Sequence, residues 1–241
     1  MKAEKLQSEL NYSVMPQKYV KSRMYEFDFS TCILVQETHD NGSVDNVFLD
    51  YFMNCGDKAY FSEEYLPMGK RKEGVKKPDI TAIIENSYSW RVKWYIYDIK
   101  DTVIKGKVAS KLCNQWHQGI EHITSEYLRD KSAYDVEPSI GVVTRYWNKK
   151  LLEVELNSYE EKLGKKSELL TARKSLVKVG EYREIIRAIK NILDGIFEDY
   201  NEITGEWNKY QINYIELNKS SDLEYTTHLE IKFEKLYIEK E

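Results

Sequence analysis

The chain has 241 residues, of which 41% are apolar and 32% charged, and its formal net charge is −4. This length and composition are typical of one large globular domain, or of one domain with an appendage, and they exclude a disordered chain. The charge balance gives no global argument for nucleic-acid binding, so such a function has to rest on local patches.

The cysteines and the N-terminus exclude further classes. Cys32, Cys55 and Cys113 are far apart and form no CxxC pair, so neither a zinc ribbon nor a disulfide framework is supported. The N-terminus lacks an apolar signal region, and no apolar run approaches the length of a membrane span. We therefore expect a protein of the reducing cytoplasm that has no membrane partner.

The first part of the chain predicts short strands followed by a helix. Residues 1–24 are polar without a clear period, whereas residues 25–37 alternate and then run apolar, which indicates one or two strands. A turn signal at 39–43 precedes the segment 44–54, in which apolar residues recur at i, i+3, i+4, i+7 and i+8. We expect a helix over 44–54 that Ser43 caps.

The middle of the chain predicts a sheet with a covering helix. A strand is expected over 58–66, and the glycine-flanked loop 69–77 holds five basic residues and one acidic residue, a net charge of +4. Between 76 and 100, two β-branched and aromatic runs joined by a polar turn indicate neighbouring strands. A helix over 107–128 and a buried strand over 139–147 follow, and this order favours a mixed sheet covered by helices.

The last part of the chain predicts two helices and two strands. Residues 150–166 are charged and helical, and residues 173–200 carry the strongest apolar stripe at helical spacing, as in a core or a dimer interface. The segments 208–217 and 226–238 alternate between apolar and polar residues. We expect them to form a hairpin or two edge strands.

Charged residues lie where the two central strands begin and end. Because side chains alternate along a strand, Asp98 and Lys100 share one face, and Asp79 lies beside Asp98 if the strands are neighbours. The two carboxylates and the Ile99 carbonyl are ligands that Mg²⁺ or Mn²⁺ would accept. Lys100 would orient a water for attack on a phosphodiester or offset charge on the phosphate. The loop 69–77 would attract a phosphate backbone.

The run Pro78-Asp79, eighteen intervening residues and Asp98-Ile99-Lys100 resembles the motif of the PD-(D/E)xK nuclease superfamily. The resemblance covers a little under half of the chain. It implies an α/β fold with a restriction-endonuclease-like mixed β-sheet core flanked by helices, to which this chain adds a C-terminal α+β region. It also implies a Mg²⁺-dependent endonuclease that hydrolyses phosphodiester bonds, with DNA favoured over RNA, of the restriction, transposition or phage-defence type. Asp79, Asp98 and Lys100 would be catalytic, and Asp79, Asp98 and Ile99 would hold the metal.

The resemblance divides the chain into three parts. These are an N-terminal extension with strands (1–42), a nuclease-like core (43–148) and a C-terminal helical region with a β-hairpin (149–241). Members of the superfamily often supply a further acid from the first helix of the core. Asp45 is preferred to Asp50 as this further metal ligand, because Asp45 flanks the apolar face of the expected helix and Asp50 lies nearly opposite.

The helix expected over 107–128 carries Lys111, Gln115 and Gln118. Some branches of the superfamily place a lysine or a glutamine on this helix. One branch carries Gln-x-x-x-Tyr there, whereas here His122 follows Gln118 by four residues. The chain therefore departs from that branch.

Other readings of the same residues stay open. The chain would alternatively be a catalytically silent, nuclease-like subunit that binds nucleic acid or takes part in assembly, as a homodimer or with a partner subunit in a larger complex. In a purely structural alternative, Asp98 and Lys100 form an exposed ion pair of little energetic value. His117 and His122 are five residues apart and lack the spacing of a helical zinc pair.

Overall fold

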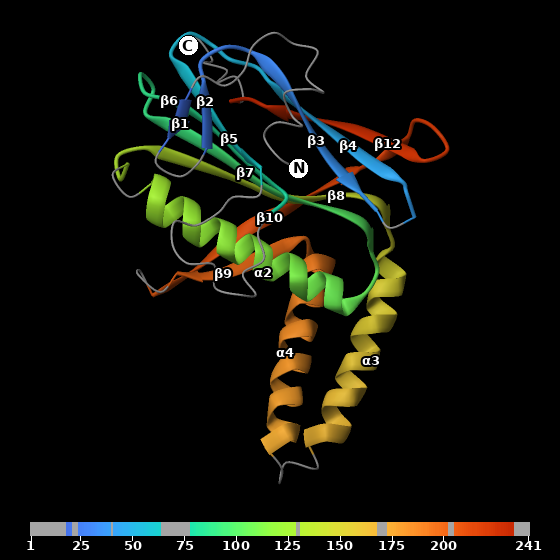
Figure 1. Cartoon of the computed structure of the whole chain (residues 1–241). Helices are drawn as coiled ribbons and strands as arrows, with labels where there is room; N and C mark the ends of the chain where they lie inside the picture. Colours follow the sequence, from blue (N-terminus) through green and yellow to red (C-terminus); the bar gives the residue numbers. More distant parts are fainter. Residues whose placement is uncertain are drawn as a thin grey trace, which may run out of the picture.

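The protein is a mixed α/β structure of two β-sheets and a layer of helices (Figure 1). A computed structural model describes residues 18–20, 24–39, 41–63, 78–128, 131–167, 173–201 and 205–233. The larger sheet has eight strands in the order β1 (Lys18–Val20), β2 (Met24–Phe27), β5 (Asp57–Glu63), β6 (Ile80–Asn86), β7 (Arg91–Val103), β8 (Asp135–Trp147), β10 (Glu206–Glu216) and β9 (Ile196–Asn201). The smaller sheet has four strands in the order β11 (Asn218–Lys219), β12 (Glu224–Ile231), β4 (Val44–Tyr51) and β3 (Thr31–Thr38). The helices are α2 (Gly106–His122), which continues as a π-helical turn (Ile123–Tyr127), α3 (Lys149–Ser167) and α4 (Arg173–Asp194).

One apolar core lies between the two sheets. Strands β3, β4 and β12 turn their alternate residues inward, and strands β5, β6 and β7 supply the opposing side chains. Fully buried members include Val47, Leu49, Ile80, Ala82 and Ile84. A sheet that buries one face in this way must alternate, and β4 does so at every position from Val44 to Tyr51.

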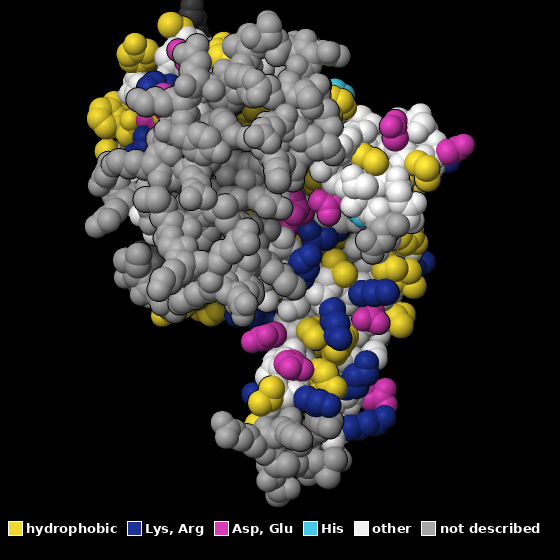
Figure 2. Space-filling view, in the orientation of Figure 1, with side chains coloured by type: hydrophobic (Ala, Val, Ile, Leu, Met, Phe, Trp, Pro, Cys, Tyr) yellow, Lys and Arg dark blue, Asp and Glu magenta, His cyan; other side chains and the backbone are white. Residues whose placement is uncertain are grey.

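A second apolar core lies on the other face of the larger sheet, where the helices cover it (Figure 1). Trp94 and Ile96 of β7 and Ile140 of β8 meet the buried side of α2, which carries Leu112 and Trp116. The helices α3 and α4 pack against each other and extend away from the sheets. Their outer surface carries Lys and Arg side chains mixed with Asp and Glu (Figure 2), as on solvated helices.

The central strands and their crossover follow the prediction. β6 and β7 form an antiparallel pair, and β7 is joined through α2 to β8, which lies parallel to it. The strand expected over 58–66, the helix over 107–128 and the buried strand over 139–147 correspond to β5, α2 and β8. β8 is fully buried through its middle, as a parallel strand covered on both faces should be.

The helix predicted over 44–54 is wrong, because this segment forms strand β4. Its apolar residues satisfy a helical period, but they also alternate. Pairing decides the outcome: β4 lies between β3 and β12 and bonds to both along eight residues. The correction matters for Asp45 and Asp50, because five positions apart on a strand they point to opposite faces.

The C-terminal prediction also needs correction. Helix α4 ends at Asp194, and Gly195, with a φ of 70°, turns the chain into β9, so the helix does not reach residue 200. The expected hairpin of 208–217 with 226–238 does not form. β10 pairs with β9 and β8 in the larger sheet, and β12 pairs with β4 in the smaller one.

Several predicted segments lie outside the described residues. These are the basic loop 69–77, most of the N-terminal segment 1–24, and the ends of two expected strands at 64–66 and 234–238. Within the described ranges, no helix combines the length and the apolar character that crossing a membrane requires.

Candidate active site

The β6–β7 hairpin brings three charged side chains to one point. Its register pairs Ile80 with Tyr97. The next residues outward, Asp79 and Asp98, therefore lie level across the hairpin. The Nζ atom of Lys100 lies 2.9 Å from Asp79 Oδ2 and 3.2 Å from Asp98 Oδ1. The structure thus brings together Asp79, Asp98 and Lys100.

The backbone of Ile99 completes this group. Lys100 Nζ donates a hydrogen bond to the Ile99 carbonyl at 3.0 Å, and the Ile99 N–H donates to Asp79 Oδ2 at 2.8 Å. The bond from the Ile99 N–H holds the Asp79 side chain against β7, although Asp79 itself lies just before the first residue of β6. Two carboxylates and one carbonyl therefore converge on a single ammonium nitrogen. We call Asp79, Asp98, Ile99 and Lys100 the acidic cradle.

Burial controls the charges of the acidic cradle. Asp98 has no exposed surface, and 13% of the Lys100 side chain is exposed. Burial raises the pKa of Asp98 to about 8, although the Lys100 ammonium acts to lower it. The pKa of Lys100 is raised: burial acts to lower it, but the charges of Asp98 and Asp79 outweigh that effect. At neutral pH most Asp98 side chains are therefore protonated, and the Lys100 ammonium is balanced by Asp79; a bound cation would favour the ionised form of Asp98.

The donor set of the acidic cradle fits a hard divalent cation. Asp98 Oδ2 is buried and has no hydrogen-bond partner among the described residues. No group of three or more His, Cys, Asp or Glu side chains is arranged to hold a metal in the part of the chain that the structure describes. Mg²⁺, however, is commonly held by one or two carboxylates together with waters and substrate phosphate oxygens. Asp79, Asp98 and the Ile99 carbonyl match that requirement, whereas a closed structural zinc site would need four nitrogen or sulfur ligands.

A further acid, Glu37 at the end of β3, acts on the cradle. The pKa of Glu37 is raised, first by desolvation and next by the charge of Asp79. Lys100, His39 and Lys111 act in the opposite direction. No pattern in the sequence predicts a role for Glu37, because its position near Asp79 depends on how the smaller sheet packs against the larger one.

Asp45 lies in a separate ion-paired group. Its side chain is fully buried; Arg145 Nε donates to Oδ1 at 2.6 Å, and His39 Nε2 lies 2.7 Å from Oδ2. Both carboxylate oxygens are therefore engaged, and no contact in the described residues joins Asp45 to the acidic cradle. Asp50 points to the other face of β4, where it pairs with His228 at 2.7 Å.

One face of α2 lies beside the cradle. Lys111, Gln115, Gln118 and His122 recur at i, i+4, i+7 and i+11 and so share this face. Gly119 lies so close to Pro78 that an added Cβ would be 2.8 Å from Pro78 Cγ. The charge of Lys111 acts to lower the pKa of Glu37 at the end of β3. The helix is therefore packed against the residue that precedes Asp79.

No protein-family model, curated protein or solved structure matches this chain. Its function has to be inferred from the chemistry and placement of its own residues.

Proposed function

We propose that this chain is a metal-dependent nuclease that hydrolyses phosphodiester bonds in nucleic acid, with Mg²⁺ or Mn²⁺ as cofactor and with DNA favoured over RNA. The observation that carries the proposal is the contact set of Lys100 Nζ. It lies within 3.2 Å of oxygens from Asp79, Asp98 and Ile99. These are the residues that the PD-(D/E)xK motif assigns to metal binding, next to the lysine that it assigns to catalysis.

Asp79, Asp98 and the Ile99 carbonyl would hold the ion. When bound, the ion would supply Lewis-acid stabilisation of the phosphate and a more acidic water. The convergence of these three oxygens and the unpartnered Asp98 Oδ2 support this assignment.

Lys100 supplies charge rather than a base. Its raised pKa keeps the side chain protonated at neutral pH. The ammonium would donate a hydrogen bond to a phosphate oxygen and offset the negative charge that develops there. Asp79 accepts a hydrogen bond from the Ile99 N–H, and this bond keeps the Asp79 carboxylate next to the other two oxygens of the cradle.

The order of elements supports a restriction-endonuclease-like core in part. Three antiparallel strands, β5, β6 and β7, are followed by α2 and by β8, which is parallel to β7. The chain departs from the expected pattern before β5, where β4 takes the place of the first helix. A metal ligand from that helix is therefore not part of the proposal.

Cleavage tests the proposal directly. Plasmid, single-stranded DNA and RNA are incubated with the protein in Mg²⁺, Mn²⁺ or chelator. We expect Asp98→Asn and Lys100→Met each to lower the rate by at least about 10²-fold, as is typical when a transition-state stabiliser is lost. Asp50→Asn is the matched control, because this acid lies on the outer face of β4. Cleavage that persists in chelator, or equal rates in all variants, would contradict the assignment.

Metal binding gives a second readout that does not need the right substrate. We expect Mn²⁺ to raise the melting temperature of the wild-type protein, since an ion at 100 times its Kd adds about 2.7 kcal/mol to the free energy of unfolding. Asp98→Asn should lose this increase and Asp50→Asn should keep it. A wild-type protein that shows neither a metal-dependent shift nor cleavage would favour a catalytically silent nucleic-acid-binding subunit.

A further inference from the structure

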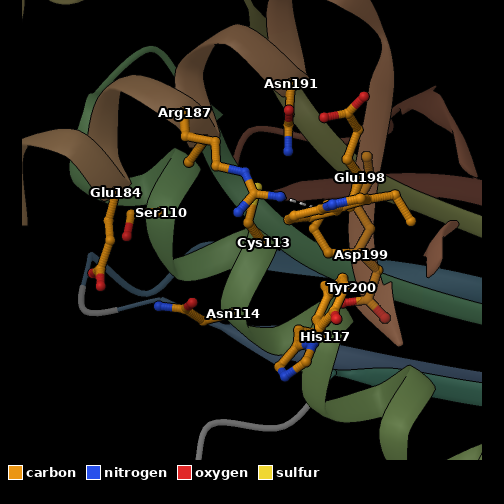
Figure 3. A pocket seen from close by; sticks show the side chains of 13 residues that line it. Ser110, Cys113, Asn114, His117, Glu184, Arg187, Asn191, Glu198, Asp199 and Tyr200 are labelled. Atoms are coloured by element: carbon orange, nitrogen blue, oxygen red, sulfur yellow. Dashed lines mark hydrogen bonds and ion pairs between the residues drawn. The ribbon is translucent and has the colours of Figure 1, made fainter. Parts of the chain in front are cut away.

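A pocket of about 300 Å³ lies on a different face of α2 from the acidic cradle (Figure 3). Residues of α2, α4 and β9 line it, together with Trp207 of β10. None of the residues that line this pocket is among the site residues that the sequence predicts. A volume of this size matches the lower end of small-molecule sites.

One wall of the pocket is a stacked platform. The guanidinium carbon of Arg187 lies 4.4 Å from the ring centroid of Trp207, and Tyr200 packs against the same ring at 5.2 Å. Arg187 also donates a hydrogen bond to the Glu198 carbonyl at 3.3 Å, which fixes the plane of the guanidinium. Trp207 is 51% exposed, although it is large and apolar. A fixed, planar Arg–Trp stack is a surface on which another planar ring can lie.

The other walls present polar groups. Asn191 is only 9% exposed, and its amide points into the space that Arg187 and Glu198 also line (Figure 3). This amide can offer two donor hydrogens and one acceptor oxygen to a ligand in that space. Opposite it, His117 Nδ1 lies 2.5 Å from Asp199 Oδ1. The Asn191 amide and the His117–Asp199 pair are therefore hydrogen-bonding groups that a ligand in the pocket would meet.

The charges in the pocket limit that ligand. Glu184, Glu198 and Asp199 disfavour an anionic group inside, and Arg187 disfavours a cationic one. Of these acids, Glu198 is paired with Lys209 and Asp199 with His117. Burial raises the pKa of Cys113 to about 12, so its thiol is no nucleophile at neutral pH. The pocket therefore suits the binding, without covalent chemistry, of a neutral, planar group with hydrogen-bonding edges.

We propose that this pocket binds a nucleobase, stacked on the Arg187–Trp207 platform and held at its edge by Asn191. The phosphates of the same strand would lie outside, on the exposed face of α2. Lys107 and Lys111 are exposed there, three residues before Ser110 and Asn114, which line the pocket. Lys111 also acts on Glu37 beside the acidic cradle. The inference rests on the proposed function in one respect: the base belongs to the strand that is cut.

Binding in the presence of chelator tests this inference without cleavage. A fluorescein-labelled single strand of about 12 nucleotides is bound at fixed salt, and anisotropy gives its Kd. Unlabelled competitors are the same strand, an abasic strand of equal length, and free nucleosides. We expect Trp207→Ala and Arg187→Lys to weaken binding by roughly 5- to 150-fold, the range found when a stacking side chain is removed. Arg187→Lys keeps the charge and removes only the planar group.

Trp90→Ala is the matched control, because Trp90 is 55% exposed and lies at the β6–β7 turn. It should change the Kd by less than about 2-fold. Circular dichroism establishes that each variant is folded. If the abasic strand competes as well as the normal strand, or if Trp207→Ala binds like Trp90→Ala, the inference is overturned.

The competitors also separate the source of the base. Competition by the oligonucleotide alone would assign the pocket to a base in a strand, and equal competition by nucleosides would assign it to a free nucleoside. Because chelator is present throughout, the binding measurement does not depend on cleavage. Failure of the nuclease proposal and failure of this one therefore give different results. Base binding without any metal-dependent cleavage refutes only the former, and cleavage by a protein that does not distinguish the abasic strand refutes only the latter.

Discussion

At the scale of single residues, Asp98 and Asp45 are both buried acids, and their partners give them different properties. Asp98 lies beside one ammonium and a second acid. Burial raises the pKa of Asp98 to about 8, because the nearby ammonium only partly offsets the loss of solvent. Asp45 has a guanidinium on one oxygen and an imidazole on the other. Arg145 in turn reaches Asp101 at 3.5 Å and stacks on Tyr225 at 4.0 Å. The satisfied acid has the character of a structural residue, and the acid with a spare oxygen has that of a ligand.

His122 on α2 makes the stability depend on pH. Burial lowers the pKa of His122 from 6.5 to about 4. Between these two values the unfolded chain binds a proton that the folded chain does not, so the free energy of unfolding falls as the pH drops through this window. We expect the wild-type protein to lose about 1 kcal/mol more unfolding free energy than His122→Gln when the pH is lowered from 7.5 to 4.5. This figure allows for the partial solvent exposure of the His122 ring.

Urea unfolding of both proteins at the two pH values measures this effect. The measurement at pH 7.5 is the internal control, because it isolates the packing change caused by the substitution. Wild type and variant that lose the same stability between the two pH values would show that His122 is not the titrating group.

At the scale of elements, α2 positions the cradle by close packing. Gly119 faces Pro78 and Ile96, and an added Cβ would lie 2.8 Å from Pro78 Cγ and 2.9 Å from Ile96 Cδ1. Only a residue without a side chain allows the helix to approach this part of the sheet. This contact holds Pro78, the residue immediately before Asp79. The packing of α2 therefore helps to position the Asp79 carboxylate.

Replacing Gly119 by alanine should therefore destabilise the protein. The clash with a proline ring and a buried isoleucine should cost about 1–3 kcal/mol, partly offset by the better helix propensity of alanine. Gly180→Ala in α4 is the matched control, because nothing lies within 4 Å of its Cβ position. It should stabilise by about 0.5–1 kcal/mol. Thermal melts of both variants test the pair, and equal shifts of the same sign would contradict the close approach of α2.

At the scale of the whole molecule, the C-terminal strands complete both sheets. β10 lies parallel to β8 in the larger sheet, and β12 lies parallel to β4 in the smaller one. Residues far apart in the chain, such as Asp45 and Tyr225, are thereby register partners. The contacts of Asp45 with residues of other strands therefore form only when these distant segments have paired and packed.

A core change in β12 should therefore destabilise the protein as a whole. Ile231 is fully buried between the sheets, and Ile231→Ala should cost about 2–4 kcal/mol. Its neighbour Glu230 is exposed, so Glu230→Ala should stay within about 0.5 kcal/mol of wild type. Urea unfolding followed by tryptophan fluorescence and by circular dichroism should give one shared transition for both variants. A separate early transition in the Ile231 variant would show that the smaller sheet unfolds independently.

Features that depend on short spacings are predictable from the sequence alone. Alternation places Asp98 and Lys100 on one face of a strand, and two adjacent apolar runs give the β6–β7 pair that brings Asp79 to them. The helical periods of α2, α3 and most of α4 are likewise local, since they follow from 3.6 residues per turn. The structure agrees with the expected elements in these segments.

Features that depend on pairing between distant segments are not predictable from local sequence and follow from the packing of the whole chain. Residues 44–51 fit both a helical and a strand period, and their bonds to β3 and to β12, about 180 positions along the chain, select the strand. The same pairing buries Asp45 against Arg145 and brings Glu37 beside the cradle. The nucleobase pocket needs α2, α4 and the β9–β10 hairpin together. Local spacing fixes the face on which a side chain lies, but strand register and sheet packing fix what that side chain meets.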